Sequence, residues 1–193
     1  MAMVPKILAF AGSTREGSYN KKLVRIAMEG VRAAGGDATF IDLRDLRLPL
    51  FDEDLEKSGL PEGAKRLKDM MRAHHGFLIS SPEYNSSLSA ALKNAIDWAS
   101  RPEPGEPPLS CFNDKVAALM ACSPGALGGL RGLVHLRAIL GNINVLVLPA
   151  QVAVMKVHEA MDASGRLTDP KQLASVERLG QNVVETIRRL SAS

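Results

Sequence analysis

The sequence has few of the residues from which metal centres and nucleic-acid surfaces are built. Its 193 residues include two cysteines and four histidines, and neither Cys111 nor Cys122 stands in a CxxC pair or at zinc-ligand spacing. No metal site is therefore predicted. Aromatic residues make up 4% of the chain, and the basic residues are scattered rather than interleaved with stacking rings. We therefore expect no nucleic-acid partner.

Long apolar runs are lacking as well. No run approaches the roughly 18–20 residues that a membrane-spanning helix needs, so no membrane span is predicted. The stretch up to Gly12 has neither the longer apolar region nor the small-residue cleavage site of a signal peptide. We expect a cytoplasmic protein whose two cysteines stay reduced.

The composition is that of an ordinary globular protein. Hydrophobic residues make up 46% and charged residues 23%, and the formal net charge is +3. A chain of this length can bury a sizeable core, so we expect residues 1–193 to form a single domain.

Segments of strand and helix character alternate along the chain. This alternation predicts an α/β fold, with a doubly wound five-stranded parallel sheet of order 2-1-3-4-5 and helices on both faces. Residues 43–62 are expected to form a surface excursion, and the state of residues 149–157 stays open. Strands are predicted at 6–11, 38–42, 76–80, 115–121 and 144–148, and helices at 20–34, 64–74, 88–100, 127–140 and from Pro170 onward.

The loop after the first predicted strand, residues 12–20, is dense in hydrogen-bond donors. Ser13, Arg15 and Ser18 lie where a strand gives way to a helix, and Ser18 or Asn20 can cap that helix. A helix N-terminus and a guanidinium together favour a phosphate group. Ser18 stands where a Walker loop needs lysine, and the loop lacks the GxGxxG spacing of a dinucleotide site. The loop therefore predicts a monophosphate site.

Two further loops follow the third and the fourth predicted strands. Residues 80–87 offer backbone groups that can hydrogen-bond a flat heteroaromatic ring, and Tyr84 can lie near that ring or reach the phosphate. Residues 122–129 are mostly small, which lets a planar ligand approach the backbone. Each loop alone is compatible with a simple turn, but the fold brings all three to one edge.

The residues of these loops resemble a known family. The pattern Gly12-Ser13-x-Arg15-x-x-Ser18-x-Asn20 is similar to the opening motif of the NADPH-dependent FMN reductases. Residues 82–85, Pro-Glu-Tyr-Asn, and residues 92–98, Leu-Lys-Asn-Ala-Ile-Asp-Trp, resemble their central motif. The resemblance covers nearly the whole chain, and the family includes quinone, azo-dye and chromate reductases.

The resemblance implies a flavodoxin-like fold that binds FMN. The phosphate contacts would come from the first loop and the isoalloxazine contacts from residues 82–85, with a looser match at Ser123 and Gly125. No catalytic side chain is implied, because FMN carries the chemistry. Trp98 is expected to pack, whereas the role of Asp97 stays open. The implied cofactor-binding residues are Ser13, Arg15, Ser18, Tyr19, Asn20, Pro82, Glu83, Tyr84, Asn85, Ser123 and Gly125.

The function that this resemblance implies is NAD(P)H oxidation through FMN, with a ping-pong mechanism. The co-substrate is NADPH or NADH, and the acceptor is a small molecule such as a quinone, a free flavin, an azo compound or chromate. The family also implies a homodimer or homotetramer. Two alternatives remain: a flavodoxin-type electron carrier, although such carriers are usually strongly acidic, and a module that binds another phosphorylated ligand.

Overall fold

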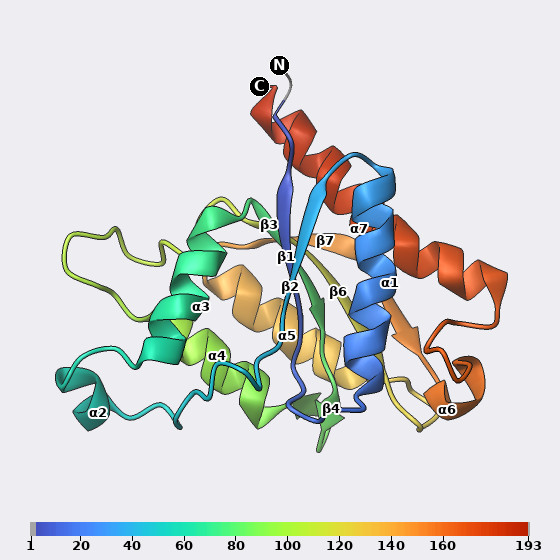
Figure 1. The fold of residues 1–193 in the computed structure, drawn as a ribbon, viewed down its shortest axis with the longest axis horizontal. Helices are drawn as coiled ribbons and strands as arrows, with labels where there is room; N and C mark the ends of the chain where they lie inside the picture. The colour runs from blue at the N-terminus through green and yellow to red at the C-terminus, as the bar shows by residue number, and fades with distance from the viewer. Residues whose placement is uncertain (1–2, 193) are drawn as a thin grey trace.

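A five-stranded parallel sheet forms the centre of the protein. The computed structural model describes residues 3–192, and its strands follow the order β2-β1-β3-β6-β7 (Figure 1). This is the predicted order 2-1-3-4-5 of a flavodoxin-like fold, so the fold class is confirmed. The strands of this sheet are β1 (Lys6–Ala11), β2 (Asp37–Ile41), β3 (Gly76–Ser80), β6 (Val116–Cys122) and β7 (Leu146–Val154).

Helices cover both faces of the sheet. Apolar residues at helical spacing turn α1 and α7 toward one face, while α3, α4 and α5 cover the other (Figure 1). None of the helices within residues 3–192 has the length and apolar character that a bilayer crossing requires. The helices are α1 (Tyr19–Ala33), α2 (Glu53–Lys57), α3 (Glu62–Ala73), α4 (Ala90–Ser100), α5 (Leu130–Asn142), α6 (Val157–Ala160) and α7 (Pro170–Ser191).

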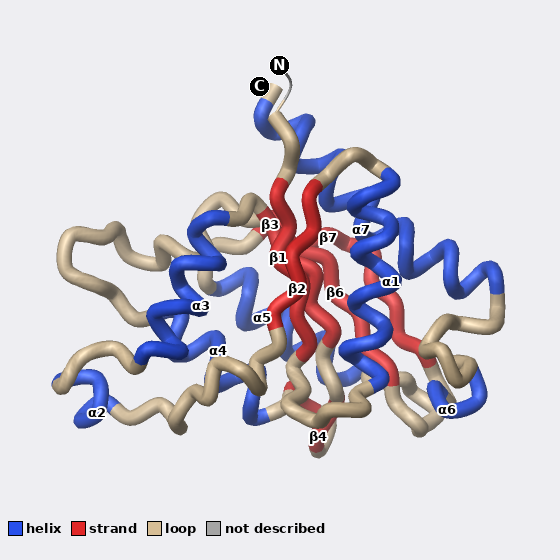
Figure 2. The backbone as a smooth tube through the Cα atoms, viewed as in Figure 1, coloured by secondary structure: helices blue, strands red, loops and turns tan. Residues whose placement is uncertain are grey.

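A small hairpin precedes α4, where the sequence had predicted that the helix would already begin. Strands β4 (Glu83–Tyr84) and β5 (Ser87–Leu88) pair antiparallel beyond the end of β3 (Figure 2). Its two turn residues, Asn85 and Ser86, have φ angles of 49° and 66°, as a two-residue type I′ turn requires. The predicted helix start at residue 88 is therefore wrong: the cap is Ser89, whose hydroxyl accepts from the amide of Leu92 at 3.2 Å.

The predicted boundaries of α5 and of the last strand are also wrong. Gly128 and Gly129 have φ angles of 62° and 91°, so they form a turn, and α5 begins at Leu130 rather than at residue 127. A Cβ atom on Gly128 would lie 2.8 Å from the carbonyl carbon of Val154. The undecided segment 149–157 mostly extends β7, which pairs with β6 past an irregularity near Leu119.

The excursion at residues 43–62 is held firmly against α4. The carbonyl oxygen of Pro49 accepts from the Asn94 side chain at 2.8 Å and from the Trp98 indole at 2.9 Å. Trp98 is fully buried and meets the Phe51 ring edge-on, so its expected packing role is confirmed. Asp97 pairs with Lys93 at 2.7 Å, one turn earlier on the surface of α4.

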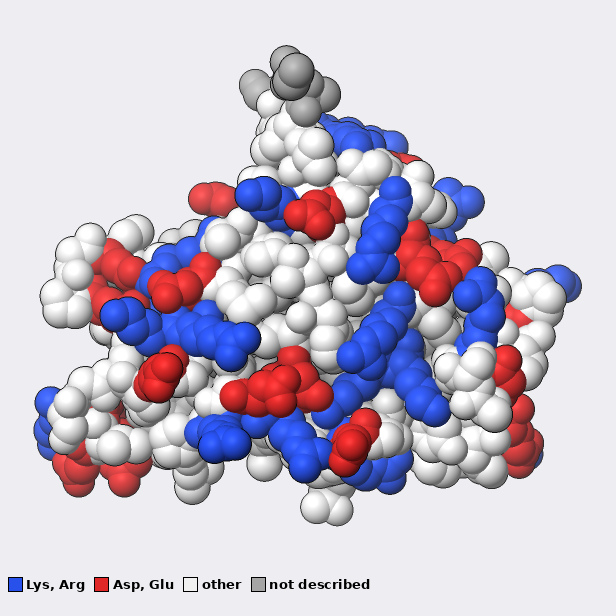
Figure 3. Space-filling model, viewed as in Figure 1, with Lys and Arg blue, Asp and Glu red and all other residues white. Residues whose placement is uncertain are grey.

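Charges of both signs are interleaved on the face shown in Figure 3. Elsewhere along the chain, the buried amine of Lys21 pairs with Asp42 at 2.6 Å. Among residues 3–192, no group of three or more His, Cys, Asp or Glu side chains is arranged to hold a metal ion.

Candidate functional site

The loop between β1 and α1 begins with a glycine that nothing larger can replace. The amide of Gly12 donates to the Ser80 carbonyl at 2.9 Å, and its carbonyl accepts from the Ser89 hydroxyl. A Cβ atom on Gly12 would lie 2.8 Å from the Cβ atom of Leu92. Close contact between the first loop and α4 therefore fixes where the loop leaves the sheet.

A cavity of about 160 Å³ opens at the carboxyl ends of the strands, where the three predicted loops meet. It unites the first loop with Tyr84 from the hairpin and with Cys122 and Pro124 from the third loop. Convergence of these loops was predicted, but Cys122, Pro124 and Val157 were not identified from sequence. The lining residues are Ser13, Arg15, Ser18, Tyr19, Asn20, Tyr84, Cys122, Pro124 and Val157.

The first loop presents this cavity with donors that have few or no protein partners within residues 3–192. Ser18 occupies the N-cap position of α1, yet its side chain makes no capping bond. Within residues 3–192, the amides of Tyr19 and Asn20 have no acceptor either. The amide of Arg15 donates to the Ser13 hydroxyl at 3.3 Å, whereas its exposed guanidinium, within residues 3–192, donates only to the Gly17 carbonyl at 3.1 Å. A hydroxyl, two helix-end amides and a guanidinium around one hollow suit a phosphate dianion.

The side chain of Asn20 turns away from this set and toward the sheet. Its Oδ1 atom accepts from the Ser80 hydroxyl at 2.8 Å and from the Cys122 amide at 3.1 Å. Its Nδ2 atom donates to the Cys122 carbonyl at 3.1 Å. Two N–H groups of Asn20 remain unbonded in these contacts: its backbone amide and one N–H of the carboxamide.

The hairpin residues point in different directions. Tyr84 is 58% exposed and lines both the cavity and a groove beside α5, whereas Asn85 lines the groove and not the cavity. The Glu83 carboxylate accepts from the Arg131 side chain at 2.8 Å and from the Arg131 and Gly132 amides at 3.0 and 3.3 Å. Pro82 is buried and, like Glu83, does not line the cavity.

In the third loop, Ser123 and Gly125 shape the turn beside the cavity. The Ser123 hydroxyl accepts from the Gly125 amide at 3.3 Å, and neither residue lines the cavity. Cys122 lines it, but burial raises the pKa of its thiol to about 12. The thiol therefore stays protonated at neutral pH and is no nucleophile.

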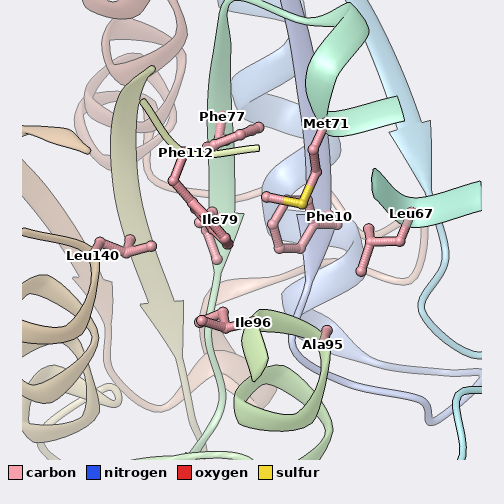
Figure 4. Close-up of a pocket in the computed structure, with 9 residues that line it drawn as sticks. All are labelled: Phe10, Leu67, Met71, Phe77, Ile79, Ala95, Ile96, Phe112 and Leu140. Carbon is pink, nitrogen blue, oxygen red and sulfur yellow. The ribbon is translucent and has the colours of Figure 1, made fainter. Parts of the chain in front are cut away.

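Another cavity, shown in Figure 4, lies inside the core between the sheet and helices α3, α4 and α5. It holds only about 10 Å³, and apolar residues such as Phe10, Met71 and Phe112 enclose it. A space this small without polar partners is a packing void rather than a ligand site.

Comparison with known proteins shows the family of this chain. The family model of the NADPH-dependent FMN reductases matches residues 5–159. The chain belongs to this family. This membership makes the protein an oxidoreductase that depends on a reduced nicotinamide and has FMN as its cofactor.

Individual FMN reductases and related proteins are similar over almost the full chain. An NAD(P)H-dependent FMN reductase of Pseudomonas aeruginosa is 37% identical over 186 residues, which cover 96% of each chain. A 2-hydroxy-1,4-benzoquinone reductase of a Burkholderia species is 34% identical over 166 residues and 86% of each chain. The structure of FerB, an NAD(P)H:(acceptor) oxidoreductase from Paracoccus denitrificans, superposes with a TM-score of 0.81 at 29% identity, covering 96% of this chain and 98% of FerB.

The donors around the cavity are of the kinds that suit a phosphate group such as that of FMN. The Ser18 side chain lines the cavity and, within residues 3–192, makes no capping bond, so its hydroxyl is free to donate to a ligand atom there. Ser13, Arg15 and Ser18, with the amides of Tyr19 and Asn20, could hold the phosphate, and Tyr84 lines the same cavity.

Glu83 connects the hairpin to α5, so its titration should change the free energy of unfolding with pH. Burial alone would raise the pKa of Glu83, but hydrogen bonds from Arg131 and Gly132 outweigh it and lower the pKa. A carboxylate with a lowered folded-state pKa stabilises the protein above its unfolded pKa, and this stabilisation is lost as the pH falls through the folded pKa. Protonation of Glu83 should therefore loosen the hairpin in acid.

We expect Glu83→Gln to lower the free energy of unfolding by about 1–2 kcal/mol at neutral pH, because a charged acceptor of three donors is lost. The difference from the unmodified protein should shrink as the pH falls below the unfolded pKa. Urea titrations over a pH series measure this. Asp97→Asn, which breaks only a surface pair, is the control and should cost less than about 0.5 kcal/mol. An equal cost for Glu83→Gln at all pH values would contradict the assignment.

Proposed function

We propose that the enzyme transfers a hydride from NAD(P)H through FMN to a quinone. In the net reaction, NAD(P)H and a proton reduce the quinone to a hydroquinone and leave NAD(P)⁺. The observation that carries the proposal is the cavity with unpartnered phosphate donors in a chain of the FMN reductase family. Relatives named as quinone reductases favour a quinone as the acceptor.

The chain's own residues bind and orient, since no nucleophile is activated in the cavity. When bound, FMN accepts the hydride and passes two electrons to the acceptor. Arg15 and the α1 amides fix the phosphate end, while the hairpin, locked by Glu83, fixes the backbone of residues 82–85 for the ring. Tyr84, at 58% exposure, stands at the open side where nicotinamide and quinone would enter in turn.

Steady-state kinetics test this proposal. With purified protein reconstituted with FMN, we expect NAD(P)H consumption that depends on the quinone, and initial-rate plots with parallel lines, as a ping-pong mechanism requires. Negligible turnover with tightly bound FMN would indicate a flavodoxin-type carrier instead. Failure to bind FMN would indicate a module for another phosphorylated ligand.

We further propose that the enzyme is a homodimer or homotetramer, with α5 at an interface between copies. Leu130 and Val134 lie one turn apart on α5 and are 42% and 59% exposed. Beside them, an open groove runs between the hairpin and α5, lined by Tyr84, Leu88 and Ile139. Because Tyr84 lines both the groove and the cofactor cavity, a second copy in this groove would lie next to the flavin.

Light scattering at micromolar concentration should give a mass at least twice that of one chain. Val134→Lys should shift the mass toward the monomer, because a charge would be buried in an apolar contact. Leu55→Lys, on the remote helix α2, is the control and should leave the mass unchanged. A monomeric mass for the unmodified, FMN-loaded protein would overturn the proposal.

A cytoplasmic location also remains a proposal. It is supported by Cys111 and Cys122, which are both buried and unpaired, as is usual in a reducing compartment. Cell fractionation with an antibody against the chain tests it.

A further inference from the structure

Asn20 joins three parts of the cofactor site through its side chain. It belongs to α1, directly behind the phosphate loop, and it contacts Ser80 at the end of β3 and Cys122 at the end of β6. The start of α1 and the carboxyl ends of β3 and β6 meet at the same end of the sheet (Figure 1). We propose that Asn20 is a positioning residue that ties the three loops together, and that its carboxamide is not a ligand of the phosphate. The inference rests on the proposed flavin site.

The hydrogen bonds of the carboxamide leave little capacity for a ligand. Asn20 is 5% exposed, and Oδ1 already accepts two hydrogen bonds, which uses both of its lone pairs. Oδ1 would in any case repel a phosphate oxygen. Of the two Nδ2 hydrogens, one is donated to the Cys122 carbonyl.

The sheet explains why Cys122 needs this partner. Pairing between β3 and β6 runs as far as Ser80 and Met120, and the Ser81 amide still donates to the Met120 carbonyl at 2.9 Å. Cys122 lies two residues further, so its N–H and C=O point toward the same side as those of Met120. Beyond Ser80 the chain turns into the hairpin, so β3 offers Cys122 no backbone partner. The Asn20 carboxamide bonds to the N–H and C=O of Cys122 instead. Without it, two buried backbone groups would lose their partners.

The consequence is a link between the phosphate loop and the start of the third loop. The backbone of Cys122 leads directly into Ser123 and Pro124, which stand beside the cavity. Losing the carboxamide should therefore disturb both the ring end and the phosphate end of the site. Losing a true phosphate ligand should disturb the phosphate end alone.

Binding of FMN and of riboflavin, which lacks the phosphate, separates these roles. We expect Asn20→Ala to weaken both flavins by a similar factor, about tenfold or more, in equilibrium dialysis. Ser18→Ala is the matched control: it should weaken FMN and leave riboflavin unchanged. If Asn20→Ala weakens FMN alone, Asn20 is a phosphate ligand and the proposal is overturned.

Hydrogen exchange on the protein without flavin gives an independent readout. The Cys122 amide, bonded to Oδ1 of Asn20, should exchange at least about tenfold faster in Asn20→Ala and stay protected in Asn20→Asp, which keeps the acceptor. Ser80→Ala, a milder change, should weaken both flavins less than Asn20→Ala does. Unchanged Cys122 exchange in Asn20→Ala would overturn the proposal. Absence of flavin binding by the unmodified protein would overturn the proposed function but leave this exchange test valid.

Discussion

Replacing Arg15 with alanine is expected to weaken FMN binding by about 1.5–3 kcal/mol, or roughly 10- to 150-fold. The guanidinium lies at the cavity and, among the residues that the structure describes, donates only to the Gly17 carbonyl, so it is available for a charge-assisted bond with the phosphate. Arg15 is exposed and makes no ion pair within residues 3–192, so the fold should be unaffected. Fluorescence titration of the apoprotein with FMN measures the change.

Riboflavin again supplies the control for Arg15. Its affinity should be the same in Arg15→Ala and in the unmodified protein, because the phosphate is missing. Arg15→Lys should recover only part of the FMN affinity, since an ammonium keeps the charge but not the two-pronged geometry. Unchanged FMN affinity in a folded Arg15→Ala protein would show that the phosphate lies elsewhere.

The second large effect concerns the packing of α1 against α7. A Cβ atom on Gly30 would lie 1.8 Å from the carbonyl oxygen of Glu177, and one on Gly180 would lie 2.1 Å from that of Ala27. Both neighbouring atoms are backbone carbonyl oxygens of the opposite helix, and they cannot rotate away as a side chain could. We expect Gly30→Ala to lower the free energy of unfolding by about 3 kcal/mol, the upper end of the usual range for overpacking.

Gly141→Ala is the control for Gly30→Ala. Gly141 also lies in a helix, α5, but a Cβ atom there would meet nothing within 4 Å. Because alanine favours the helix over glycine, this change should be neutral or stabilising by up to about 1 kcal/mol. Denaturant titrations of both variants measure the difference. Equal stability of Gly30→Ala and the unmodified protein would mean that α1 and α7 do not cross this closely.

Sequence periodicity was sufficient for the parts of the fold that depend on local pattern. The buried strands β3 and β6 are continuous apolar runs, and α1, α3 and α7 show apolar stripes at helical spacing, so their existence, order and approximate bounds were predicted. Strand ends were harder to predict. Residues 149–154 continue β7 because they pair with β6 beyond a register shift between Ala117 and Leu119. The sequence of β7 alone does not indicate this continued pairing.

In the site, the sequence determined which loops matter, because the winding of a parallel sheet brings the loops after β1, β3 and β6 to one edge. It also named the donors Ser13, Arg15 and Ser18. Only the tertiary structure decided the direction of each side chain. Asn20 belongs to the same motif as these donors and Glu83 to the central motif, yet Asn20 bonds to the backbone of Cys122, 102 residues away, and Glu83 to the start of α5. Partners so distant along the chain are selected by which unpaired backbone groups lie within reach after folding, and no local pattern records them.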